Sequence, residues 1–335
     1  MASDDYIYAS AKVRVLESYL LNDSDMTRII EAKNPDVAFK AFNSTDYAGE
    51  LLDLEAKDYR VAMDRKMERL KKVLGHVVPD PRLLRLLFLE RDYYNMKIIF
   101  KEKLVGSEFE ENLESAPGIC RVDQLRRYII DEQDADIDIE VIGDINDVRA
   151  ELGTETDPEM IESLIDKKLN KRNMLLAESI GNDFIITLYK YLADKNNINL
   201  FLRSRRLEKG KAWFMSRVSD GGFIGLNTYE QLYDHQDDNE LMVRLASNFG
   251  PAIQSYLDDY LKDKEIWRIE LGINNVIMEH LKNAKLVGYG PEVVVAYYFA
   301  KKYAIKNLST IMALKFGAVE PAEIRKHLVN NYQLT

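Results

Sequence analysis

The amino-acid sequence predicts an all-helical protein built from three related units. Three observations support this fold class. Apolar residues recur at helical spacing, prolines stand where helices should begin, and one pattern of residues occurs three times along 335 residues. A chain of this length usually forms two or three domains, which agrees with several units.

Residues 47–74 are predicted to form a long amphipathic helix. Apolar residues recur there at helical spacing and charged residues lie between them, which is typical of a helix with one buried stripe. Gly75 follows as the expected end, because glycine suits the backbone conformation of a helix C-terminus. The apolar positions are Leu51, Leu52, Tyr59, Met63, Leu70 and Leu74.

Six of the eight prolines are predicted to open helices. Proline loses nothing at the first helical position, because its missing N–H would be unpaired there anyway. Asparagine, aspartate or glycine precedes five of them, and each is an accepted N-cap. The prolines are Pro35, Pro81, Pro158, Pro251, Pro291 and Pro321, and the caps are Asn34, Asp80, Asp157, Gly250 and Gly290.

Residues 136–141 carry the best strand signal. They alternate between acidic and apolar side chains with a period of two. The segment is acidic and has no neighbouring strand signal. We therefore predict a linker or a small edge element there.

The repeated pattern is anchored on an asparagine, at Asn95, Asn197 and Asn307. Apolar residues follow one, four and five positions later in each copy. A helix start precedes each asparagine, and a glycine-containing turn and a short helix follow it. Eight positions after the asparagine each copy has a cation; these are Lys103, Arg205 and Lys315.

The repeat predicts three helical units with approximate boundaries at 1–115, 116–235 and 236–335. Each unit is roughly the size of a small domain. A linear solenoid normally stacks many shorter repeats, so three large units favour closure about a pseudo-threefold axis. This closure is a hypothesis from the number and size of the repeats.

Composition argues against several classes of protein. The net charge of −10 argues against a protein devoted to nucleic acid, which normally has a basic excess. A single cysteine, Cys120, cannot form a disulfide within the chain. The longest apolar run, 293–300, is far shorter than the roughly 20 residues of a spanning helix. No signal peptide is predicted, because residues 1–8 lack a basic and an apolar region.

No catalytic, cofactor-binding or metal-binding residues are predicted. The four histidines have no metal-ligand spacing, so a structural or solvent-facing role is favoured for all of them. The sequence at 288–292, Gly-Tyr-Gly-Pro-Glu, lacks the Lys-Ser/Thr pair of a phosphate loop and is interpreted as a helix entry. The histidines are His76, His235, His280 and His327.

The cations Lys103, Arg205 and Lys315 allow two interpretations. Cations near a helix C-terminus commonly complement its dipole, and this interpretation is favoured. Alternatively, a threefold set of cations faces an acidic partner and steers docking. The basic stretch 203–211 contains the middle one.

At this point the sequence resembles a known family. Residues 288–317, with 320–328 after them, look like the C-terminal signature of the C subunits of A-type and V-type ATPases, whose eukaryotic counterpart is the d subunit. Residues 8–17 and 92–97 are also similar to that family. Asn199 departs from the first repeat, which has Lys97 at that place.

The resemblance implies a funnel of three similar helical bundles without an active site. It implies a cytoplasmic connector that joins the D and F subunits of the central stalk to the membrane proteolipid ring, which is made of K or c subunits. In this role the protein transmits torque between ATP turnover and ion translocation. No cofactor, no nucleic acid and no membrane span of its own are expected.

Three other functions stay open at this stage. The first is a helical adaptor of another multisubunit assembly, which would not need threefold closure. The second is a nucleic-acid-binding protein that uses residues 203–211, against which the net charge weighs. The third is an enzyme with an unrecognised site, which would require a pocket with perturbed titratable groups.

Overall fold

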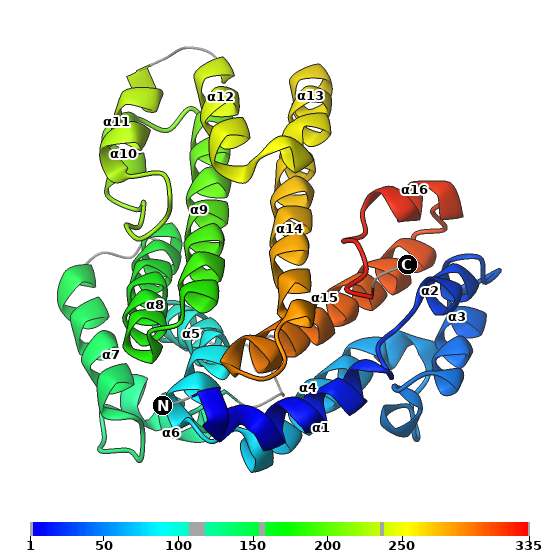
Figure 1. Ribbon diagram of the computed structural model, residues 1–335. Helices are drawn as coiled ribbons and strands as arrows, with labels where there is room; N and C mark the ends of the chain where they lie inside the picture. The colour runs from blue at the N-terminus through cyan, green and yellow to red at the C-terminus, as the bar shows by residue number, and fades with distance from the viewer. Residues whose placement is uncertain (1–2, 107–117, 154–157, 235–237, 334–335) are drawn as a thin grey trace. The chain divides into compact units, whose positions relative to one another are not determined.

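The computed structural model describes residues 3–106, 118–153, 158–234 and 238–333, and every regular element in these ranges is a helix (Figure 1). The all-α prediction is therefore confirmed. The chain divides into two compact units. Unit 1 comprises Met1–Asp80, Asn182–Tyr191 and His235–Thr335, and unit 2 comprises Pro81–Gly181 and Leu192–Asp234. The division into three repeat units about a threefold axis stays a prediction.

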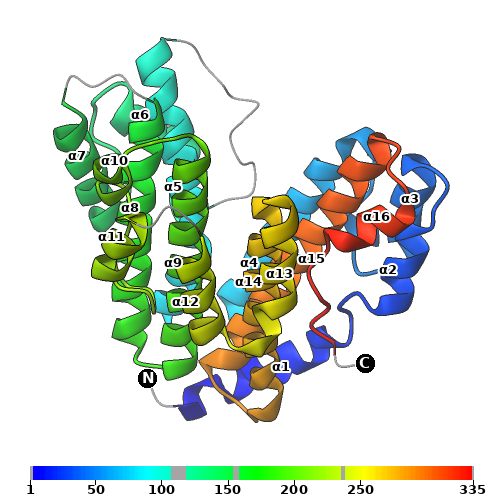
Figure 2. The same ribbon diagram turned by 90° about the horizontal axis from the view of Figure 1, so that it is seen from above.

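Unit 1 is organised around its longest helix, α15. This helix lies against α1 and α4 (Figures 1 and 2), and it also contacts α3 and α14. The α-helices of the unit are α1 (Ile7–Glu17), α2 (Asp23–Ile30), α3 (Pro35–Ala41), α4 (Tyr59–Val77), α12 (Asn239–Phe249), α13 (Gln254–Asp263), α14 (Ile266–Lys282), α15 (Pro291–Phe316) and α16 (Pro321–Lys326).

The first third of α15 is buried on all sides. Every residue from Val293 to Ala300 is at most 4% exposed. The apolar run that is too short to span a membrane therefore forms the centre of the unit 1 core. Farther along, Leu308, Ile311 and Met312 join a cluster with α2, α3 and α4.

Unit 2 is built on two long antiparallel helices, α5 and α8, which pack along each other. The short helices α6 and α7 lie against this pair, and α10 packs on α11. Helix α9 (Asp183–Arg206) belongs to unit 1 up to Tyr191 and to unit 2 from Leu192. The other helices are α5 (Pro81–Val105), α6 (Val122–Ile129), α7 (Ile139–Leu152), α8 (Pro158–Ile180), α10 (Lys211–Met215) and α11 (Leu226–Asp234).

All six prolines begin a helix, as predicted. Five open α-helices, and Pro251 opens a short 3₁₀ helix directly before α13. Asn34 caps α3 with its side chain, whose Oδ1 accepts the N–H of Val37 at 2.9 Å. Asp157 lies outside the described residues.

The helix predicted over 47–74 is wrong in its bounds. It begins only at Tyr59 and continues through Gly75 to Val77. Residues 48–58 form two 3₁₀ turns instead, because Asp53 has a left-handed φ of 61° and Glu55 begins a capping box with Asp58.

Residues 136–141 do not form a strand. Helix α7 begins at Ile139, and the Asp138 side chain accepts the N–H of Glu140 at 2.9 Å. The predicted linker is therefore correct only for residues 136–138, which have no regular structure, whereas 139–141 are helical because aspartate is a favoured N-cap.

The asparagine repeat has a common structural role in two of its copies. Asn197 Nδ2 donates to the Ser219 carbonyl at 2.7 Å, and its Oδ1 accepts the Ser219 N–H at 3.0 Å. Asn307 makes the same pair of bonds with Val329, at 2.8 and 3.0 Å. Each asparagine thus clamps a backbone position 22 residues downstream. Asn95 is equally buried, and the position 22 residues after it lies outside the described residues.

Two aspartates hold a second turn in the first two copies. Asp92 accepts the N–H groups of Ile119 and Cys120 at 2.6 and 3.0 Å. Asp194 accepts those of Phe223 and Ile224 at 2.8 and 3.2 Å. The third copy has Ala304 at this position and therefore lacks the carboxylate. Each carboxylate fixes the turn that leads into the following short helix, α6 or α11.

Candidate functional site

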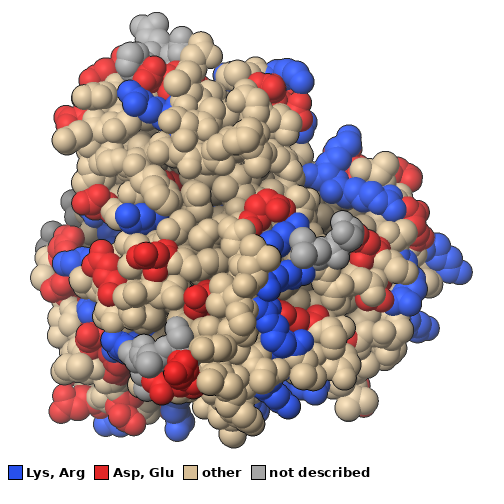
Figure 3. Space-filling view, viewed as in Figure 1, with Lys and Arg blue, Asp and Glu red and all other residues tan. Residues whose placement is uncertain are grey.

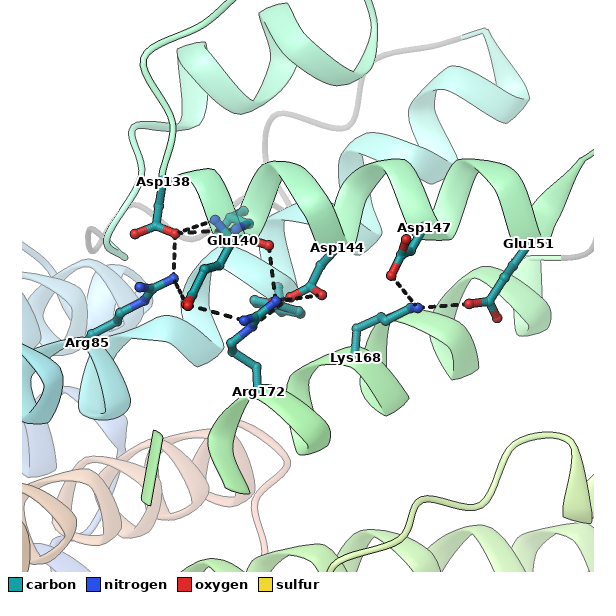
Figure 4. Close-up of polar contacts among 10 residues, drawn as sticks. Arg85, Asp138, Glu140, Asp144, Asp147, Glu151, Lys168 and Arg172 are labelled. Atoms are coloured by element: carbon teal, nitrogen blue, oxygen red, sulfur yellow. Dashed lines mark hydrogen bonds and ion pairs between the residues drawn. The ribbon is translucent and has the colours of Figure 1, made fainter. Parts of the chain in front are cut away.

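The most extended polar network of unit 2 joins α7 to α5 and α8. Figure 4 shows that carboxylates of α7 point toward Arg172 and Lys168 of α8, and that Asp138 and Glu140 flank Arg85 of α5. The carboxylates follow the helical period, so they lie on one face of α7. They are Glu140, Asp144, Asp147 and Glu151.

The centre of this network is the pair of Arg172 and Asp144. Arg172 donates from Nε and Nη2 to the two carboxylate oxygens at 3.1 and 3.0 Å, which is a bidentate contact. Burial lowers the pKa of Arg172, but the hydrogen bonds and charge of Asp144 raise it further, so its net pKa lies above the usual value. Tyr93 also donates its O–H to Asp144. Burial raises the pKa of Tyr93, and the charge of Asp144 adds to this, so the phenol stays protonated.

At the other end of α7, Lys168 bridges two carboxylates. Its Nζ lies 2.9 Å from Asp147 Oδ2 and 2.8 Å from Glu151 Oε1. In a sequence such alternating charges are typical of a solvated helix surface, because a single sequence does not show which charges meet across helices. The sequence does contain a signal for this network, because the carboxylates of α7 recur at helical spacing and so share one face of the helix.

A second network lies in the interior of unit 1. Two lysines, Lys66 of α4 and Lys301 of α15, point their ammonium groups at Asp46 Oδ2 from 2.9 and 2.6 Å. Their side chains are only 6% and 2% exposed. Glu50, which is also buried, lies 3.7 Å from Lys66 and 3.2 Å from Arg69.

The electrostatics of this network keep the charges paired. Burial lowers the pKa of Lys301, while the charge of Asp46 opposes that shift. Burial raises the pKa of Asp46, but the two lysines lower it further, so its net pKa is below the usual value. Buried charges are stable only when paired in this way. The network therefore ties α4 and α15 to the 46–50 turn.

The three repeated cations each reach the carbonyl end of another helix. Lys103 donates to the Ile129 carbonyl at the end of α6 at 2.8 Å, and Arg205 donates to Leu232 in the last turn of α11 at 3.5 Å. Lys315 is 8% exposed and donates to Ala32, just after α2, at 2.5 Å. These contacts satisfy helix-end carbonyls and complement the helix dipole. The role of these cations toward a partner stays a prediction.

Further features of the described residues that bear on function are metal-ligand clusters, membrane-spanning helices and the histidines. The described part of the chain contains no cluster of three or more His, Cys, Asp or Glu side chains that would hold a metal. No described helix is long and apolar enough to cross a membrane. His280 binds the Phe184 carbonyl through Nε2 at 2.9 Å and stacks on the Phe184 ring, which is a structural role.

On the face shown in Figure 3, Lys and Arg side chains lie over α15 and α16 with Asp and Glu side chains among them. Lys306 pairs with Glu270 at 2.9 Å, and Lys326 pairs with Glu323 at 2.7 Å. Exposed pairs of this kind contribute little to stability. These pairs place positive and negative charges side by side on this surface.

These observations define a class of protein: an all-helical chain whose helices are held together by buried polar networks. A sequence model of the ATP synthase (C/AC39) subunit family matches residues 9–327. The chain therefore belongs to this family, whose members are non-catalytic subunits of the ATPase complex.

Relatives from this family match over nearly their whole length. The chain is 22% identical to the C subunit of the A-type ATP synthase of Methanocaldococcus jannaschii, over 97% of this chain and 86% of the relative. It is 28% identical to the C subunit of the V-type ATP synthase of Thermus thermophilus, over 98% and 99%. It is also 16% identical to the C subunit of the V-type sodium ATPase of Enterococcus hirae, over 98% and 100%.

Proposed function

We propose that this chain is the central-stalk connector of a rotary A/V-type ATPase. In this role it links the D and F subunits of the stalk to the proteolipid ring of K or c subunits, and passes torque between ATP turnover and ion translocation. The chain is held on the cytoplasmic side of the membrane through the complex. Family membership over residues 9–327 supports this proposal.

The observation that carries the proposal is a recurring contact: after α9 and after α15, a turn is held by the side chain of a buried asparagine on that helix. Asn197 and Asn307 each fix a buried backbone position with two hydrogen bonds. A torque coupler must resist deformation, and close packing with satisfied buried polar groups provides stiffness. The repeat has three copies, which also supports three similar helical bundles arranged around a central cavity that receives the stalk.

Depletion of the chain from the assembled ATPase tests the coupling role. Without the connector, the peripheral sector should still hydrolyse ATP, while ATP-driven ion uptake into vesicles should be lost. Adding back the purified chain should restore uptake. Unchanged ion uptake in depleted vesicles would reject the connector role.

Purification through a tag on this chain tests the partners. Mass spectrometry of the membrane fraction should identify the D and F subunits and the proteolipid together. Recovery of another multisubunit assembly without any of these would favour the alternative function, a helical adaptor.

We also propose that Lys103, Arg205 and Lys315 steer the chain toward an acidic partner surface. Because each already contacts a helix-end carbonyl, charge reversal removes an internal contact as well. The triple glutamate variant should therefore be compared with a triple glutamine variant. Weaker assembly in the glutamate variant at equal stability would support steering, and equal assembly of both variants would reject it.

A further inference from the structure

A groove in unit 2 runs along one face of α8. Its volume is about 470 Å³. The α8 residues that line it recur every three or four positions, so they share one face of that helix. They are Leu164, Lys167, Lys168, Lys171, Met174 and Leu175. The rest of the lining is Glu151, Met215, residues 218–221 and Leu226, so it includes two carboxylates, those of Glu151 and Asp220.

The groove has an apolar floor that reaches solvent. Leu164, Met174 and Val218 are buried, whereas Leu175 on the edge is 48% exposed. Met215 also lines the groove and is half-buried. Methionine side chains are flexible and polarizable, so a floor with two of them adapts to differently shaped apolar partners.

The rim of the groove carries cations that lack ion-paired carboxylates. Lys167 donates to the Ser216 carbonyl at 3.0 Å. Lys171 is exposed and makes no ion pair within 4 Å among the described residues, although alongside Lys168 its charge helps to lower the pKa of Asp147. Lys168, in contrast, is already bound to Asp147 and Glu151. Of the two lining carboxylates, Glu151 is paired with Lys168, and Asp220 accepts the N–H of Gly221 at the far wall. Two ammonium groups, those of Lys167 and Lys171, therefore flank the apolar floor without a carboxylate in direct contact.

We propose that this groove binds an amphipathic helix of a partner protein, with apolar anchors on one face and Asp or Glu beside them. The wall formed by residues 164–175 of α8 extends for about 16 Å, or three helical turns. A helix laid along it would place residues i, i+3, i+4 and i+7 between the side chains of α8, as in ridge-and-groove packing. Its carboxylates would lie beside Lys167 and Lys171.

A helix fits this groove better than an anionic lipid does. A phosphate headgroup is bound by donors that converge on it. Here the middle lysine is occupied by two carboxylates, and the two lysines without a paired carboxylate lie on either side of it in the sequence. Such spacing suits carboxylates distributed along a helix.

Fluorescence anisotropy with two designed peptides tests the proposal. Both peptides are helices of about 18 residues with the same leucine stripe, flanked in one by glutamate and in the other by lysine. The full chain should bind the glutamate peptide at least tenfold more tightly than the lysine peptide. Leu175→Asp and Lys171→Glu should each weaken that binding about tenfold. Leu286→Asp and Lys33→Glu are matched controls outside the groove and should not change it.

Two outcomes would overturn the proposal. One is equal or absent binding of the two peptides. The other is binding of the glutamate peptide that Leu175→Asp and Lys171→Glu leave unchanged while circular dichroism shows folded variants. Flotation with phosphatidylglycerol vesicles gives a further comparison: vesicle binding that depends on Leu175, without peptide binding, would assign the groove to lipid instead. The measurement uses the isolated chain, so its result is independent of the proposed coupling role.

Discussion

At the scale of single residues, the side chains that define this fold are polar and buried. Asn197, Asn307, Asp92 and Asp194 use their oxygens and amides to satisfy backbone groups of turns. Removing one partner of a buried hydrogen bond leaves the other unsatisfied, which costs about 1–3 kcal/mol. These residues therefore fix which turn follows each long helix.

Gly222→Ala should destabilise the protein, because a Cβ atom at this position would lie 2.0 Å from Asp194 Oδ1. Asp194 would have to give up its bonds to the turn. We expect a loss of about 2–4 kcal/mol in the free energy of unfolding, measured by urea titration. Gly225→Ala is the matched control, since nothing lies within 4 Å of its added Cβ. Equal stability of the two variants would contradict this role of Asp194.

His280 should make the stability of the protein depend on pH. Burial lowers its pKa below the ordinary value of 6.5, although the Phe184 carbonyl opposes the shift. The unfolded chain then binds a proton at higher pH than the folded chain does. Stability is therefore complete above about pH 6.5 and falls as the pH drops toward the folded pKa.

Thermal unfolding between pH 7.5 and 5.5 measures this dependence. His280→Gln should flatten the curve over that range, whereas His76→Gln, a change at an exposed histidine, should not. A wild-type curve that is already flat would contradict the prediction.

At the scale of helices, charge decides how α7 is held. Its acidic face meets cations of α5 and α8, and Asp144 is nearly buried beneath Arg172. A buried pair is weak evidence for net stability, but losing one partner leaves an uncompensated charge that costs about 3–5 kcal/mol. The same network fixes the register of α7 against α8.

Arg172→Met should increase local opening of α7 under conditions in which the rest of the chain stays folded. Among the described residues Asp144 would retain Tyr93 as its one hydrogen-bond partner, so α7 should exchange its amide hydrogens faster than α5 does. Hydrogen-exchange mass spectrometry measures this difference. Lys72→Met, which removes an exposed pair with Glu68, is the control and should change exchange little. Unchanged protection of α7 in Arg172→Met would show that the apolar contacts alone hold it.

At the scale of the whole molecule, the question is how the repeated segments are arranged. The chain divides into two compact units, and the threefold layout of three repeat units is our proposal. The residue before each repeat asparagine is exposed in all three copies, which gives equivalent positions for probes: Tyr94, Asn196 and Lys306.

Spin labels at pairs of these positions test closure. In a Cys120→Ser background, cysteines at Tyr94, Asn196 and Lys306 can be labelled two at a time. A trigonal layout predicts three similar distances by pulsed electron resonance. A linear layout predicts one distance about twice the other two, and that result would reject the funnel.

Local chemistry in the sequence determined much of the secondary structure. The prolines located six helix starts, because ring geometry and the missing N–H act within one turn of the chain. The asparagine repeat located three of the long helices, α5, α9 and α15, and the turns that follow them. The alternation at 136–141 misled, because Asp138 caps α7 through contacts that hydrophobic alternation does not encode.

Only the tertiary structure decided what the charged residues do. In the sequence, Lys66, Lys301 and the acidic face of α7 look like the charges of any solvated helix. Their partners come from segments far away in the chain, as with Asp46 and Lys301, and an ion pair forms only where packing brings two such segments within about 4 Å. Helix formation depends on neighbours in sequence, whereas the pairing of buried charges depends on neighbours in space.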